Sequence, residues 1–177
     1  RFVEELMRFI RIPSVSAQEK HDADTRACAQ WIADHLKGLG FEAGLIDVGG
    51  KPIVRASMKG ASSKRVLIYG HYDVQPEDPL GEWKTPPFEP TIRDGILYGR
   101  GATDDKGQVF THVKAVESLL KTEGTLPCGV VFLLEGEEES GGDALARYVS
   151  QAKDELKSDA VVVSDSTMYD ANTPAIT

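Results

Sequence analysis

Three apolar runs that each lead into acidic or imidazole side chains constrain the fold of this chain most. The runs are VLIYG (66–70), VVFLLEG (130–136) and AVVVS (160–164), and they lead respectively into His71 and Asp73, into Glu137, Glu138 and Glu139, and into Asp165. None of the runs has a polar face, and segments with helical periodicity lie between them. Buried strands that alternate with helices predict an α/β fold, with a mainly parallel mixed sheet and helices on both faces.

The remaining elements follow from the periodicity of apolar residues and from turn signals. Helices are predicted over 2–12 (ended by Pro13), 22–39, 104–121 and 141–157. Strands are predicted over 41–48 and 52–58, with a turn at Gly49-Gly50, and a short strand over 96–101. The proline-rich stretch 75–95 predicts an irregular surface loop.

Composition excludes several classes of protein. With 177 residues, 41% of them hydrophobic, the chain can form one domain with a sizeable core. A net charge of −8 argues against nucleic acid as a partner. Cys28 and Cys128 form no CxxC pair, which fits a reducing, cytoplasmic location. No apolar stretch approaches the ~20 residues of a membrane span, and no signal peptide is visible. Because the chain opens on Arg1 and stops without a capping signal, we expect a fragment of a longer protein.

The acids after the strands favour a metal site. The carboxyl ends of neighbouring parallel strands share one edge of the sheet, where ligands bind. Crowded carboxylates are costly unless a cation lies among them. Imidazole with carboxylates suits zinc, manganese or cobalt, whereas sites made only of oxygen suit calcium or magnesium. Further candidate residues of this metal site are Glu135 and the pair Asp104 and Asp105 of TDDKG.

This number of acids suggests two ions that together activate a water molecule, with a glutamate outside the ligand set as general base. The pattern therefore indicates metal-assisted hydrolysis. Simpler interpretations stay open at this point. Acid runs are common in solvated loops, Asp104 or Asp105 could cap a helix, and His71 with Asp73 could form a purely structural hydrogen bond. The other histidines match no motif and are interpreted as structural or solvated: His21, His35 and His112.

Four ordered motifs resemble one known family. GHYDVQP, the segment PPFEP to LYGRGATDDKGQ, EGEEESG and SDS are similar to motifs of the co-catalytic zinc metallopeptidases related to carnosinase. That family also includes acetylornithine deacetylase, succinyl-diaminopimelate desuccinylase, aminoacylase and carboxypeptidase G. The motifs of this chain are most similar to those of the cytosolic dipeptidase and carnosinase branch. The likeness extends from IPSVS to SDS. It implies a zinc-exopeptidase-like (phosphorylase/hydrolase-like) fold, with residues 1–177 as the N-terminal portion of the catalytic domain. It further implies that the lid and dimerisation domain and the C-terminal part of the catalytic domain lie outside this chain.

The resemblance also implies roles for individual residues. His71 and Asp165 would bind one metal ion, and Asp104 would bridge the two. Glu139 would bind the second ion, and Glu138 would be the general base and later the general acid. Asp73 would act from behind the ligands by fixing the geometry of the site. Two further acids have lesser expected roles. Asp105 would cap the helix or support the ligands, and Glu137 would be an acidic neighbour of the site.

The implied activity is that of a dinuclear exopeptidase of the dipeptidase or carboxypeptidase type, which cleaves amide bonds of dipeptides or short peptides. The ions would be two Zn²⁺, with Mn²⁺ or Co²⁺ as alternatives, and the parent protein would be a homodimer. Hydrolysis of N-acyl amino acids at the same site is an alternative, and a non-catalytic metal-binding or partner-binding fragment is another. Because no histidine follows Asp165 to complete the second ion's ligands, we expect this fragment alone to be inactive.

Overall fold

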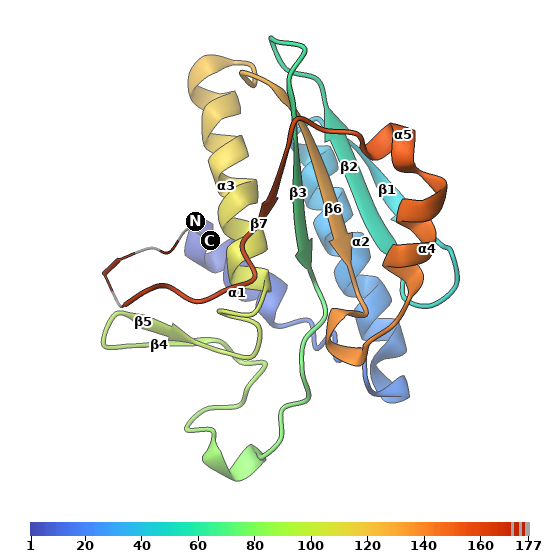
Figure 1. Ribbon diagram of the computed structural model, residues 1–177. Coiled ribbons are helices and arrows are strands. Elements are labelled where there is room, and N and C mark those ends of the chain that lie inside the picture. Colours follow the sequence, from blue (N-terminus) through green and yellow to red (C-terminus); the bar gives the residue numbers. More distant parts are fainter. Residues whose placement is uncertain (171, 174, 176–177) are drawn as a thin grey trace.

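The computed structural model describes residues 1–170, 172, 173 and 175, and its centre is a five-stranded mixed sheet (Figure 1). The strands lie in the order β1-β2-β6-β3-β7. Pairs β1/β2 and β2/β6 are antiparallel, whereas β6/β3 and β3/β7 are parallel. The three predicted apolar runs are therefore direct neighbours, with β3 in the middle. The strand bounds are β1 (Glu42–Ile46), β2 (Ile53–Met58), β3 (Arg65–His71), β6 (Gly129–Glu135) and β7 (Ala160–Val163).

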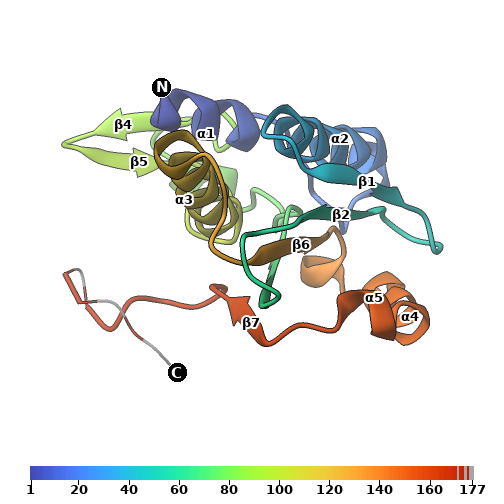
Figure 2. The same cartoon turned by 90° about the horizontal axis from the view of Figure 1, so that it is seen from above.

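Helices cover both faces of the sheet, as predicted (Figure 2). One face carries α1 (Phe2–Ile10), α2 (Asp22–Gly38) and α3 (Lys106–Glu123), and the other carries α4 (Ala144–Gln151) and α5 (Lys153–Leu156). The predicted helix over 141–157 is thus divided into two short helices. Three short 3-10 helices complete the helical elements: η1 (Glu19–His21), η2 (Leu80–Glu82) and η3 (Glu138–Ser140).

The core has two layers because side chains alternate along each strand. Every residue of β6 is buried. Its residue Phe132 belongs to the layer under α2 and α3, which also contains Ile32 and Val113. The next residue, Leu133, packs in the layer under α4 with Tyr148. Burial on both faces explains why the β6 sequence is an unbroken apolar run, and it fixes the position where the strand leaves the core.

One part of the stretch predicted as a loop is ordered as a hairpin. Strands β4 (Thr91–Arg93) and β5 (Ile96–Tyr98) form a separate antiparallel sheet. The two residues between them, Asp94 and Gly95, both have positive φ values, 52° and 77°. Asp-Gly is a favoured pair for such two-residue turns. The prediction of an irregular loop is therefore wrong for residues 91–95.

Along the part of the chain that the structure describes, the helices are all too short or too polar to cross a lipid bilayer.

Candidate metal centre at the carboxyl edge of the sheet

His71 is the last residue of β3 and is completely buried. The residue before it, Gly70, lets the start of α3 approach the strand, because an added Cβ would lie 2.5 Å from both Asp105 Oδ2 and Val109 Cγ2. Asp105 Oδ2 instead accepts a hydrogen bond from the His71 backbone N–H at 3.0 Å. This contact joins the beginning of α3 to the end of β3.

The two nitrogens of the His71 ring have different surroundings. Nδ1 lies 3.1 Å from the main-chain oxygen of Asp73 and 3.3 Å from its Oδ1. Both atoms can only accept, so Nδ1 carries a hydrogen. Nε2 points the other way, into a group of carboxylates. This is the arrangement in which the second nitrogen of a histidine is available to bind a metal ion.

Three carboxylates from three different segments of the chain surround Nε2. It lies 3.1 Å from Asp104 Oδ1, 3.7 Å from Asp165 Oδ2 and 4.0 Å from Glu138 Oε2. Ligand atoms bound tetrahedrally to one zinc ion at ~2.0–2.1 Å lie ~3.3 Å apart. The spacing therefore fits atoms that surround a common cation, and the predicted convergence of the strand ends is present in the fold.

Two overlapping groups of ligand atoms can be distinguished. One consists of His71, Glu138 and Asp165, and the other of His71, Asp104 and Glu139, with ligand atoms within 4.8 Å of one another in each. Since Nε2 can bind only one ion, both groups cannot use it at the same time. Among the described residues, none of these four acids forms an ion pair with a lysine or arginine. Their oxygens and the imidazole thus fit a divalent cation.

The pKa values express the excess of negative charge. Burial alone would lower the pKa of His71, but the hydrogen bond and charge of Asp73, with the charges of Asp105 and Asp165, raise it to about 10. Burial raises the pKa of Asp105 to about 7, against the hydrogen bond from His71. Burial also raises the pKa of Glu139. The carboxylates that raise the pKa of His71 would equally favour a divalent cation at its Nε2.

Asp73 lies behind the site and contacts two of its segments. It is fully buried, and its Oδ2 accepts hydrogen bonds from Ser16 Oγ at 2.6 Å and from the Glu139 backbone N–H at 3.1 Å. Its other oxygen faces His71 Nδ1. Asp73 therefore fixes the histidine ring relative to the Glu139 segment and does not itself face the carboxylate group.

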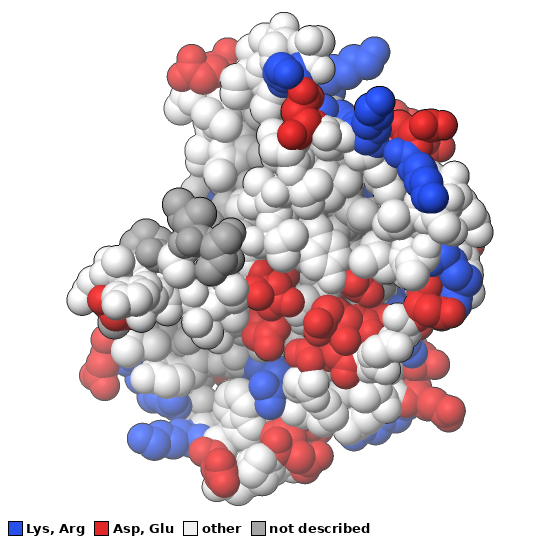
Figure 3. Space-filling view, in the orientation of Figure 1, with Lys and Arg blue, Asp and Glu red and all other residues white. Residues whose placement is uncertain are grey.

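The site opens to solvent on the side of the acids. The side chains of Asp104, Glu138 and Asp165 are 57%, 38% and 28% exposed, whereas His71 is 0% exposed. Acidic surface gathers over the region where β3, β6 and β7 end (Figure 3). Asp104 and Asp165 are among the residues that line a cavity of about 960 Å³. A small molecule could therefore reach these carboxylates from solvent.

Two glutamates of the β6 exit have structural contacts. Glu137 accepts hydrogen bonds from the backbone N–H groups of Lys51 at 2.8 Å and Ala144 at 3.2 Å. An added Cβ at Gly50 would lie 2.2 Å from its Oε1, so the β1–β2 turn closes directly onto this carboxylate. The second is buried Glu135, which accepts a hydrogen bond from Tyr69 Oη at 2.6 Å.

Two neighbours of the site were not identified from the sequence. Gln75 donates a hydrogen bond through Nε2 to Glu139 Oε2, and Ser16 donates to Asp73. Gln75 lies within the GHYDVQP motif, which could have indicated it. Ser16 is separated from Asp73 by 57 positions, and no local pattern connects them.

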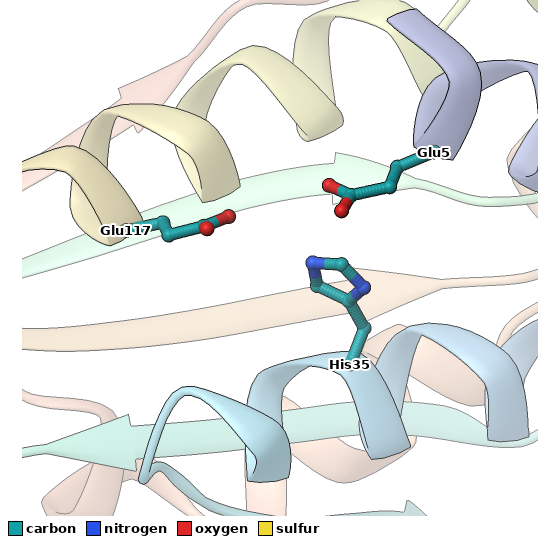
Figure 4. A group of neighbouring side chains, drawn as sticks. All are labelled: Glu5, His35 and Glu117. Atoms are coloured by element: carbon teal, nitrogen blue, oxygen red, sulfur yellow. The ribbon is translucent and has the colours of Figure 1, made fainter. Parts of the chain in front are cut away.

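A second group of histidine and acids lies elsewhere and is not a metal site. Glu5, His35 and Glu117, from α1, α2 and α3, point toward one another (Figure 4), with ligand atoms within 4.8 Å. The ammonium group of Lys114 already lies among them. Its Nζ donates hydrogen bonds to His35 Nε2 at 2.9 Å and Glu117 Oε2 at 2.6 Å, and it lies 2.5 Å from Glu5 Oε2. A lysine thus occupies the position that a cation would need.

Comparison with known proteins identifies the family. The family model described as "Peptidase family M20/M25/M40" matches residues 67–177, which include every acid of the site. The chain belongs to this peptidase family. A Beta-Ala-His dipeptidase of Homo sapiens is 35% identical over 99% of this chain and 38% of that protein. A succinyl-diaminopimelate desuccinylase of Azoarcus sp. is 42% identical over 63% of this chain and 29% of that protein.

Solved structures support the same family and the predicted fold class. The crystal structure of an M20 family metallo-carboxypeptidase, Sso-CP2 from Sulfolobus solfataricus, superimposes with a TM-score of 0.88 at 35% identity. The match covers 95% of this chain and 38% of that one. The chain therefore spans less than half the length of these relatives. Family membership implies divalent metal ions, and the His71 group contains suitable ligands for them.

Proposed function

We propose that the protein is a metal-dependent hydrolase that cleaves the amide bond of dipeptides or short peptides at the His71 site. The single observation that carries this proposal is the environment of His71 Nε2. A buried imidazole nitrogen faces three carboxylates, and these have no lysine or arginine partner among the described residues. Membership of a peptidase family gives this site its reaction class.

The proposed ligands are those that the resemblance to the family implies, and their side chains all lie in the groups around His71. His71, Asp104 and Asp165 would hold one ion, and Asp104 with Glu139 would hold a second, so that Asp104 is shared. We propose zinc for both, with manganese or cobalt as alternatives, because the ligands combine imidazole with carboxylates. Bound ions would supply Lewis acidity for hydrolysis at this edge of the sheet.

The chain's own residues would handle the proton and the orientation of the site. Glu138 is the proposed general base, which takes a proton from the attacking water and later gives it to the leaving amine. Its carboxylate borders the ligand group and is 38% exposed, so it can meet both water and substrate. Asp73 would keep Nδ1 of His71 protonated and the ring in place.

The second ion needs a further ligand from outside this set. We propose that residues 1–177 are the N-terminal portion of the catalytic domain, and that another part of the protein supplies a histidine together with the lid and dimerisation domain. The chain covers only 38% of the human dipeptidase that it matches, which supports this division. We therefore propose that this portion alone is inactive and that the whole protein is a cytoplasmic homodimer.

Hydrolysis of N-acyl amino acids is the second candidate. The observation that favours it is the 42% identity to a succinyl-diaminopimelate desuccinylase, a protein named for removal of an acyl group. Both reactions break an amide bond and could use the same ligands and base. The dipeptidase match covers 99% of the chain and the desuccinylase match 63%, so we place dipeptides first.

Metal removal and replacement in the complete protein tests the proposal. Prolonged chelation should abolish hydrolysis of β-Ala-His, and added Zn²⁺, Mn²⁺ or Co²⁺ should restore it. His71→Ala should lose bound metal in an elemental assay. Full metal content in His71→Ala would contradict its role as ligand, and activity that survives chelation would contradict metal-dependent hydrolysis. Preference for an N-succinyl amino acid over the dipeptide would favour the second candidate.

A further inference from the structure

A hydrogen bond between His112 and Ser164 connects α3, which begins close to Asp104, with the segment that leads from β7 into Asp165. The atoms His112 Nε2 and Ser164 Oγ lie 2.6 Å apart. His112 lies in α3, the helix that begins just after Asp104 and Asp105. Ser164 is the residue immediately before Asp165. Both side chains are half-buried, and burial lowers the pKa of His112, so the ring is neutral near pH 7.

The sheet itself does not hold Asp165. The last pair between β3 and β7 is Tyr69 with Val163, whereas β3 continues beside β6 as far as His71. Ser164 and Asp165 therefore lie beyond the end of the β7 ladder. Another contact has to fix the position of the Asp165 carboxylate, whose Oδ2 lies 3.7 Å from His71 Nε2.

The His112–Ser164 contact can supply that support. Within the described part of the chain, it is the only side-chain hydrogen bond between α3 and residues 160–170. The carbonyl oxygen of Ser164 also accepts a hydrogen bond from the Ser166 N–H at 2.9 Å, which forms a tight turn around Asp165. The first turn of α3 is already fixed to β3 through the contact of Asp105 with His71. Because α3 is a continuous helix, His112 has a fixed position relative to His71, and the hydrogen bond to Ser164 fixes the end of β7 in turn.

We propose that His112 is a positioning residue for the metal site: it holds Ser164 so that the Asp165 carboxylate faces His71 Nε2. This inference rests on the proposed function, because it assigns His112 an influence on the ion that His71 and Asp165 would share. His112 touches neither the ion nor substrate. Loss of comparable supporting contacts reduces metal affinity about 10- to 100-fold.

Metal binding by the complete protein tests the inference. The variants are His112→Phe, Ser164→Ala and the double variant, and the probes are Zn²⁺ in competition with a chelator and the visible absorption spectrum of the Co²⁺-loaded protein. Each single variant should bind one ion about 10- to 100-fold more weakly and change the cobalt spectrum. The double variant should lose no more than either single one, because both remove the same contact.

Controls separate positioning from general destabilisation. Ser118→Ala removes another α3 hydroxyl, which donates only to Lys114 O within the helix, and should leave the affinity and the spectrum unchanged. Ser164→Ala removes a single oxygen and decides the question if His112→Phe does not fold. Wild-type affinity and spectrum in the folded variants, or additive losses in the double variant, would contradict the role of His112 alone. A wild-type protein that binds no divalent ion would contradict the proposed function itself.

Discussion

Among the described residues, two clusters combine one histidine with several acids, and only one of them contains a lysine that balances the acids. At the edge of the sheet, His71 faces Asp104, Glu138 and Asp165, and no lysine or arginine among the described residues pairs with these acids. Under the helices, Lys114 lies between Glu5, His35 and Glu117. Glu117 also pairs with two further basic side chains, those of Lys121 and Arg1.

The difference shows that a set of ligand atoms within bonding range is insufficient evidence for a metal site. Both clusters satisfy the same geometric criterion. An ammonium group has three hydrogens and a full positive charge, so it satisfies a buried pocket of acceptors permanently. The cluster that lacks such a group keeps an unbalanced negative charge, and two of its acids, Asp104 and Asp165, line the cavity of about 960 Å³.

The largest expected difference concerns catalysis. Glu138→Gln in the complete protein should lower kcat by about 10²- to 10⁴-fold, because a general base would be lost while its shape is retained. The bound metal, measured by elemental analysis, should stay near the wild-type amount. Loss of metal in this variant would show that Glu138 is a ligand and that the roles of Glu138 and Glu139 are exchanged.

A change in the helix cluster should affect stability instead. Lys114→Met should destabilise the protein by about 3 kcal/mol, because it leaves two glutamates and a histidine without their shared cation. Urea unfolding would measure this loss. The folded variant should retain its kcat, since Lys114 is remote from the His71 site. Unchanged stability would show that Lys121 and Arg1 are sufficient for Glu117.

The smallest expected effect is a difference in pH dependence. Burial opposes ionisation of Glu117, but hydrogen bonds from Lys114, Lys121 and Arg1 lower its pKa to about 2. A lowered pKa contributes stability above the ordinary carboxyl range, and this is lost as the pH falls from about 4.5 toward 2. Unfolding free energies at several pH values should therefore decrease less steeply in Glu117→Gln than in the wild type. Parallel curves for the two proteins would contradict the lowered pKa.

The convergence at His71 could be predicted because it depends on patterns that are local in sequence. Apolar runs with no polar face indicate buried parallel strands, and the ends of such strands meet. The positions of His71, Glu139 and Asp165 follow from that rule, although their roles as ligands stay predictions. Asp104 follows the separate β4–β5 hairpin and could be associated with the site only through its motif. The turn at Asp94-Gly95 also had a local signal, which the proline-rich surroundings obscured.

Other features depend on contacts between distant positions and had no such signal. Glu137 binds the backbone of Lys51, 86 residues away, so the acid run EGEEES divides between a structural carboxylate and candidate site residues. Lys114 meets His35 across 79 residues, and nothing in either helix predicts that a lysine fills this cluster. The same holds for His112 and Ser164, which are 52 residues apart. Periodicity predicts which elements form, but tertiary packing decides which polar side chains meet.

Anomalous scattering at the zinc edge, from crystals of the complete protein grown with zinc, tests most directly whether the two clusters differ as described. We expect a strong peak among His71, Asp104 and Asp165, and no peak among Glu5, His35 and Glu117. A structure with no peak beside His71, or with zinc in place of the Lys114 ammonium group, would contradict the assignment of the metal centre.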